Sequence, residues 1–221
     1  MMYVHPEYEF SIDTSKEGVN TIVIESQTAF RTIIADILEQ VDGKEGKSVL
    51  SEGNTPLDMT RHAELLMDPI GFDINRKSLL SKIVTAMEKS SQNSEHYAAI
   101  AQLMAQLEIL IDNLAFEHPC DMRYTKLSFG SILKSIGLAV RDEYDDQLEK
   151  LVDYMELVRE FEGDKLFFIV NLRSFFEDGK ISLFMETVRE HGYHVVLLES
   201  TERSKLPREI RSTIDTDLCE F

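Results

Sequence analysis

The chain has 221 residues, and its 40 acidic and 23 basic residues give a formal net charge of −17. A hydrophobic content of 43% is ordinary for a globular protein, and the length suits one large domain or a domain with a lobe. The acidic balance opposes nucleic acid on average. A local basic surface can still bind phosphates, because physiological salt screens charges beyond about 8 Å.

The N-terminal stretch MMYVHPEYEF lacks the charged-then-apolar layout of a signal peptide. No uninterrupted apolar run approaches the roughly 20 residues needed to span a bilayer. Cys120 and Cys219 lie far apart, which excludes a disulfide framework and a CxxC pair. We therefore expect a cytoplasmic protein with reduced thiols and no membrane segment.

The first third of the chain predicts strands around one helix. Alternating apolar residues at Tyr8, Phe10 and Ile12 predict an edge strand, and residues 21–25 (TIVIE) predict a buried one. Residues 26–40 have the apolar stripe of a helix, which Ser26 can cap. Two short strands are expected at 48–50 and 63–67.

The segment Gly43–Ser48 (GKEGKS) ends like a phosphate-binding P-loop. A P-loop needs GxxxxGK[ST] directly after a buried strand and before a helix. Here Val41 stands at the first glycine position, a helix precedes the segment, and a strand is expected after it. A hairpin turn is therefore favoured over a nucleotide site.

The positions where a nucleotide site belongs also lack its residues. The TIVIE strand runs into its helix through ESQTAF without a glycine, and Asn171 follows the strand KLFFIV where an acidic magnesium ligand would be needed. We therefore expect a sheet like that of a nucleotide hydrolase without the hydrolase chemistry.

The middle of the chain is predicted to be helical. Residues 76–90, 94–117 and 126–136 show apolar helical spacing, with Gly137 ending the last. Without a strand between them, these helices form a lobe inserted into an α/β domain. The predicted organisation is a discontinuous α/β head, residues 1–73 and 138–221, and a helical leg, residues 74–137.

Residues 165–199 predict the centre of the sheet. The runs KLFFIV and YHVVLLE are typical of strands buried on both faces. Between them, Ile181, Phe184, Met185 and Val188 have helical spacing, and Gly192 occupies the stop position. This is a βαβ unit. A helix at 147–161 leads into it, and the tail from Ile210 predicts a last edge strand.

No catalytic set emerges from the sequence. Neither HExxH nor GxSxG occurs, and Cys120 has only nearby His118 as a base. Asp112, Glu117 and Asp121 gather at the end of the long predicted helix, where carboxylates could hold calcium. His118 and Cys120 could instead help to hold zinc, and a solvated acidic helix end is the simpler alternative.

Basic residues gather in two segments, for which ordinary salt-bridged surface is the alternative to phosphate binding. Neither segment has the interleaved aromatic residues of single-strand binders, so any nucleic acid would be a duplex held by its backbone. The lobe contributes Arg76, Lys77, Lys82, Lys89, Arg123, Lys126 and Lys134, and the segment TERSKLPREIR contributes Arg203, Lys205, Arg208 and Arg211.

The chain resembles the small accessory protein of type II-A CRISPR systems that acts in spacer acquisition. The resemblance is dispersed over the whole chain and rests on ELLMDPIGFDIN, FEHPCDM, ILKSIGLAV and the pair KLFFIVN and HVVLLE. None of these is a catalytic signature.

The resemblance implies a P-loop-like head with a degenerate nucleotide site and an inserted helical leg. It implies a homotetrameric ring that encircles double-stranded DNA, which enters the ring at its linear ends. It also implies structural calcium near the leg. Glu117 and Asp121 match acidic positions of the family. Asp112, from the same acidic helix end, is the third expected calcium ligand. The chain departs from the family pattern at Arg123, Tyr124 and Thr125, where further acidic residues are usual.

Three hypotheses follow. The first is a non-enzymatic ring that binds DNA ends during spacer acquisition with other CRISPR adaptation proteins. Its expected lumen residues are Arg76, Lys77, Lys82, Lys126 and Lys134. The second is a divergent P-loop nucleotide kinase or NTPase that uses Lys47 and Ser48. The third is an α/β scaffold that binds only proteins.

Overall fold

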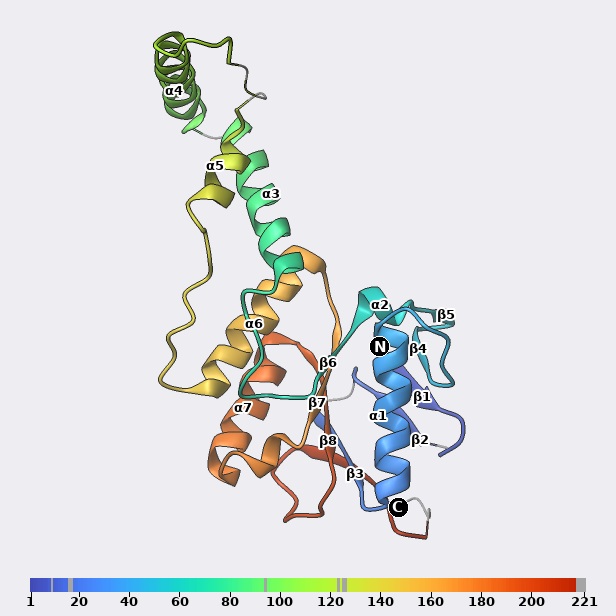
Figure 1. Cartoon of the computed structure of the whole chain (residues 1–221). Coiled ribbons are helices and arrows are strands. Elements are labelled where there is room, and N and C mark those ends of the chain that lie inside the picture. Colours follow the sequence, from blue (N-terminus) through green and yellow to red (C-terminus); the bar gives the residue numbers. More distant parts are fainter. Residues whose placement is uncertain (9, 16–17, 94, 123, 125–126, 218–221) are drawn as a thin grey trace. The chain divides into compact units, whose positions relative to one another are not determined.

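The computed structural model describes residues 1–8, 10–15, 18–93, 95–122, 124 and 127–217 (Figure 1). The chain divides into two compact units. The α/β unit contains Met1–Asp73 and Tyr144–Phe221, and the helical unit contains Ile74–Glu143.

A five-stranded parallel sheet forms the centre of the α/β unit. Its order is β6-β7-β8-β3-β9, and every neighbouring pair is parallel. The strands are β3 (Val19–Ile24), β6 (Ala63–Leu66), β7 (Leu166–Val170), β8 (His194–Glu199) and β9 (Glu209–Ile214). All residues of β3 and β7 are buried, because elements cover both faces of the sheet.

Helices lie on both faces of this sheet. Helix α1 (Gln27–Val41) covers one face, and α6 (Gln147–Glu162) and α7 (Asp178–His191) cover the other (Figure 1). The predicted capping of α1 is confirmed, since the Ser26 hydroxyl accepts a hydrogen bond from the Ala29 amide at 3.4 Å. The short helix α2 (Met59–His62) leads into β6.

The structure contains a second sheet that the sequence revealed only in part. It has four antiparallel strands in the order β2-β1-β4-β5: β1 (Met2–His5), β2 (Phe10–Asp13), β4 (Val49–Glu52) and β5 (Thr55–Pro56). Tyr3, Phe10 and Leu50 from this sheet are buried in one core with Ile33 of α1 and Phe168 of β7. The second sheet and α1 therefore share one hydrophobic core with the parallel sheet.

The predicted βαβ unit is confirmed as β7, α7 and β8, and it lies in the middle of the parallel sheet. A short 3-10 turn, η1 (Leu172–Ser174), follows β7. Gly192 ends α7 with φ +68°, the left-handed conformation expected of it. The predicted edge strand in the tail is β9, which extends β3's side of the sheet.

The described part of the helical unit consists of α3 (Lys77–Asn93), α4 (Tyr97–Phe116) and α5 (Phe129–Ser135), in agreement with the predicted helices. The two ends of this unit are tied together by Asn75. Its side-chain amide donates to the Val140 carbonyl at 2.9 Å and its side-chain oxygen accepts from the Val140 amide at 2.7 Å.

The two glycines of α7 provide a matched test of its backbone. Gly192→Ala should lower the free energy of unfolding by about 1 kcal/mol, because alanine is strained at φ +68°. Gly179→Ala should raise it by up to roughly 0.5 kcal/mol, because Gly179 is the second residue of the helix and a Cβ there meets open space. Urea denaturation measures the free energy of unfolding of both variants. Changes of the same sign would contradict the assigned positions of the two glycines.

Candidate functional site

The GKS segment lies between a helix and a strand. Helix α1 ends at Val41, Gly43 turns the chain with φ +84°, and β4 begins at Val49. This order is the reverse of a P-loop, in which a strand precedes and a helix follows. The prediction that a helix precedes this segment and a strand follows it is confirmed. The predicted hairpin turn is wrong, because the segment joins a helix, α1, to a strand, β4.

The backbone amides of this segment already bind an anion from the chain itself. The Asp36 carboxylate on α1 accepts hydrogen bonds from the Lys47 amide at 2.6 Å and from the Ser48 amide at 3.0 Å. The Ser48 hydroxyl and the Gln40 side chain also donate to it. Asp36 thus occupies the donors that a P-loop would present to phosphate.

Burial of Asp36 disfavours its charged form, but the hydrogen bonds from Ser48, Lys47 and Gln40 outweigh burial and lower its pKa. The carboxylate therefore stays ionised in the fold. The Lys47 side chain is on the surface, where its ammonium forms an ion pair with Glu7. The two residues named for a nucleotide site are thus engaged with carboxylates of the protein.

The carboxyl end of the parallel sheet is where ligands bind in open α/β proteins. Here Asn171, at the end of β7, adopts φ +52°, and its side-chain oxygen accepts from the Ser200 amide at 2.9 Å and the Ser200 hydroxyl at 2.8 Å. Asn171 thus fastens the end of β7 to the end of β8. At the end of β3, Ser26 caps α1.

From the ends of β7 and β8, a largely buried charge cluster that sequence reasoning missed extends to Glu209 at the start of β9. Arg173 contacts Asp178 at 2.8 Å and Glu209 at 3.6 Å, and its backbone amide donates to Glu199 at 3.0 Å. Glu209 also accepts from Arg211 at 2.9 Å. Arg211, which the sequence placed among basic surface residues, is therefore held by a carboxylate.

The predicted metal ligands are only partly brought together. Asp112 and Asp121 line one surface pocket with His118 and Cys120, whereas Glu117 is not among its lining residues. Across the described ranges, no group of three or more His, Cys, Asp or Glu could hold a metal ion. The described residues therefore do not fit a complete calcium or zinc site.

Of residues 123–126, which follow this pocket in the chain, the structure describes only Tyr124. The Tyr124 hydroxyl donates to an Asp112 carboxylate oxygen at 3.1 Å. Arg123, Thr125 and Lys126 lie outside the described residues, as does Cys219. Calcium binding and the role of Lys126 therefore stay predictions.

The other predicted DNA-binding residues lie in the helical unit. Lys77 and Lys82 are exposed on α3, and Lys134 is exposed on α5. Arg76 precedes α3 and donates to the Ser78 hydroxyl at 2.5 Å. These side chains are accessible to a phosphate backbone, and nothing in their arrangement reads base edges.

Helix α4 is apolar, yet none of its 20 residues is buried. By length and composition it could cross a membrane, although polar residues interrupt its apolar run, as the sequence predicts. The helix carries two acidic residues, Glu108 and Asp112, one turn apart in its second half. Each would cost about 2.5–3.5 kcal/mol near the centre of a bilayer, which argues against a span.

The apolar residues of α4 include a heptad pattern that sequence reasoning did not use. Their spacing alternates between three and four residues, which is the seam of a coiled coil. Leu103, Leu110 and Leu114 are 47%, 53% and 51% exposed. The seam consists of Ile100, Leu103, Leu107, Leu110 and Leu114.

A family model described as "CRISPR-associated protein (Cas_Csn2)" matches residues 40–218. The solved structure titled "Crystal structure of Stu0660 of Streptococcus thermophilus" is similar, with a TM-score of 0.55 and 12% identity, over 90% of this chain and 68% of that one. At this identity the likeness shows the fold. No curated protein matches significantly.

The buried Glu199 carboxyl predicts a pH dependence of stability. Burial raises its pKa from 4.5 to about 7, against the opposing effect of Arg173. The fold therefore binds a proton that the unfolded chain releases between pH 4.5 and 7. Stability from this group is complete below pH 4.5 and is lost, by roughly 3 kcal/mol, as the pH rises to 7.

Glu199→Gln removes this titration while keeping the acceptor for the Arg173 amide. Urea denaturation at pH 5 and pH 7.5 should show a smaller pH-dependent loss in the variant than in the wild-type protein. Equal losses would mean that Glu199 is ionised in the fold.

Proposed function

Because this chain belongs to the Cas_Csn2 family of CRISPR-associated proteins, accessory proteins of type II-A systems, we propose that it is a non-enzymatic, sequence-independent clamp for double-stranded DNA. It acts in the cytoplasm during spacer acquisition, with other CRISPR adaptation proteins as partners. Four copies form a ring, and duplex DNA enters at a free end.

The observation that carries the proposal is the uncovered apolar seam of α4. Packing the seam against the same seam of a second copy would bury both surfaces by one self-complementary contact. Full burial of a leucine side chain contributes about 1.5–3 kcal/mol. Burial of three half-exposed leucines on each helix would therefore favour association substantially. The seam supports an oligomer, and the family resemblance supplies the number four.

An oligomer also accounts for DNA binding by an acidic chain. Phosphate contacts act over a Debye length of about 8 Å, so a local cluster of cations decides binding. We assign Arg76, Lys77, Lys82 and Lys134 to the surface that faces DNA, together with Lys126. A ring multiplies each contact by the number of copies.

The non-enzymatic role is supported by the state of the nucleotide-type loop. We propose that the parallel sheet has the frame of a P-loop NTPase whose nucleotide site has degenerated. The β3 end has no glycine loop, and Asp36 saturates the amides of Lys47 and Ser48. ATP binding that depends on Lys47 would favour the nucleotide kinase or NTPase alternative.

Calcium stays a prediction from the resemblance. Asp112 and Asp121 line one pocket, which supports a role for them in holding a hard cation with oxygen ligands. The described residues do not complete the site, so no step of the proposed function depends on the ion.

The oligomer can be tested on α4. Leu110→Glu should convert a tetramer into smaller species, because it places charge in the seam. The matched control is Leu38→Glu on α1, where the leucine is also partly exposed, at 42%, and lies outside the helical unit. Sedimentation measures the masses, and circular dichroism checks folding. A wild-type monomer, or an unchanged mass in Leu110→Glu, would contradict the seam.

DNA binding can be tested by the topology of the substrate. Linear duplex should bind in a salt-sensitive way, whereas a covalently closed circle of the same sequence should bind poorly. Lys77→Ala and Lys134→Ala should each lower the slope of log K against log salt by about 1 per contacted phosphate. Lys44→Ala, at an exposed site on the α/β unit, is the control. Equal binding to both forms would contradict end entry.

A further inference from the structure

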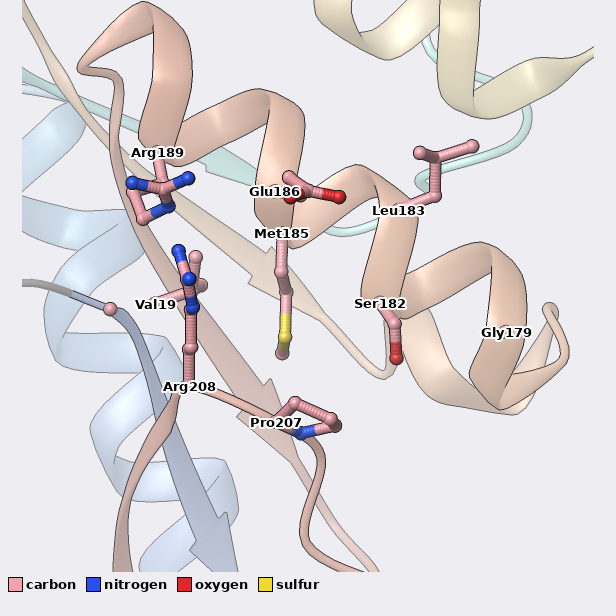
Figure 2. A pocket seen from close by; sticks show the side chains of 10 residues that line it. Val19, Gly179, Ser182, Leu183, Met185, Glu186, Arg189, Pro207 and Arg208 are labelled. Atoms are coloured by element: carbon pink, nitrogen blue, oxygen red, sulfur yellow. The ribbon is translucent and has the colours of Figure 1, made fainter.

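A groove of about 400 Å³ runs along α7 in the α/β unit. One wall is formed by α7 from Gly179 to Arg189. The other wall is formed by Pro207 and Arg208, which precede β9, and by the start of β3 (Figure 2). A volume of this size is within the range of small-molecule sites. The function proposed above makes no use of it.

Two arginines meet across this groove. Figure 2 shows the side chains of Arg189 and Arg208 pointing toward one another at one end of the cavity. Both guanidinium groups are charged at every physiological pH. Two like charges that face each other repel, so this arrangement favours an anion between them.

The hydrogen-bonding capacity of both groups is largely unused. The Nε of Arg189 is buried without a hydrogen-bond partner, and its guanidinium forms a long ion pair with Glu190 at 3.7 Å. For the Arg208 side chain, the described residues provide neither a hydrogen bond nor an ion pair. A donor without a partner is unfavourable, and a bound acceptor would supply hydrogen bonds that the two guanidinium groups lack.

Other arginines of the same unit are engaged by the protein itself. Arg173 and Arg211 are held by Glu209, and Arg159 donates to the His191 carbonyl and lies over the Tyr193 ring at 4.5 Å. Against this background the pair Arg189 and Arg208 stands apart, because both open into a cavity.

The backbone holds Arg208 in place at a cost. Its φ of +63° is a conformation that side-chain-bearing residues rarely adopt. The Arg208 carbonyl accepts from the Val19 amide at 3.3 Å, and a Cβ added at Gly18 would lie only 2.6 Å from that carbonyl. Strained residues held by their surroundings gather at ligand sites.

The rest of the groove indicates what the anion is attached to. Met185 and Val19 give it an apolar floor, and Pro207 adds an apolar edge. The exposed Glu186 offers an acceptor for a hydroxyl or amino group, and the Ser182 hydroxyl donates to the Asp178 carbonyl, which leaves its oxygen free to accept. The lining suits an anionic group on a partly apolar body that carries hydrogen-bond donors.

We propose that the groove along α7 is a binding site for a phosphate monoester, held between Arg189 and Arg208. A phosphate monoester carries up to two charges and three terminal oxygens, which two guanidinium forks can share. The same chemistry is present in a free mononucleotide and in the 5′-terminal phosphate of a DNA strand. The site does not depend on the ring or on the helical unit.

The full-length protein can be titrated calorimetrically with adenosine 5′-monophosphate, and with adenosine as the matched ligand lacking phosphate. The monophosphate should bind at least tenfold more tightly, and inorganic phosphate should compete while acetate at the same concentration should not. Equal binding of both ligands, no binding of the monophosphate, or equal competition by acetate would overturn the site.

Variants locate the binding. Arg208→Gly removes the guanidinium and suits φ +63°, so its melting temperature should equal or exceed that of the wild-type protein while affinity falls at least tenfold. Arg189→Ala should weaken binding similarly, and Arg31→Ala, at an exposed position on α1, should not. Wild-type affinity in both groove variants would refute the assignment.

A second pair of ligands separates the two sources of the phosphate. If the source is DNA, a 5′-phosphorylated duplex should bind more tightly than the 5′-hydroxyl duplex, and Arg208→Gly should abolish that difference. If the source is a free nucleotide, the two duplexes should bind equally while monophosphate binding persists.

Discussion

Helix α4 imposes the constraint on which the account depends, because a folded chain does not leave a helix of 20 mostly apolar residues without one buried residue unless a partner covers it. Membrane insertion is opposed by Glu108 and Asp112, and the heptad spacing provides a seam for a second copy. Assembly is therefore the arrangement that satisfies both the apolar and the acidic residues. In the proposed ring, such an assembly would enclose a lumen in which an acidic chain could hold DNA.

In the α/β unit, several buried charges are satisfied by the protein itself. Asp36 is bound by the amides that would otherwise attract phosphate, and Glu209 is bound by two arginines. Such saturation supports the proposed scaffolding role, because catalytic groups must remain available to a substrate. The groove between Arg189 and Arg208 is different, since its charged groups open into a cavity.

Local patterns were sufficient to predict most elements from the sequence. The apolar runs of β7 and β8, the stripe of α1 and the stop at Gly192 each depend on neighbouring residues only. Strand β1 was missed because it has four residues and because it is recognisable only from its pairing with β2 and with β4, where the buried Tyr3 faces Leu50. The partnership of Asp36 with Ser48 and that of Arg173 with Glu209 were missed because they depend on the tertiary fold. The heptad spacing of α4 is visible in the sequence, but only the structure shows that three leucines of the seam are about half exposed.

The central claim is that the protein encloses DNA as a closed assembly, and retention on end-blocked DNA tests it most directly. A linear duplex is loaded at low salt, bulky blocks are attached to both ends, and the salt concentration is then raised. The account predicts that protein stays on the blocked duplex and leaves the open one, because the ring can escape only over an end. Equal release from both would show that the duplex is held on an open surface.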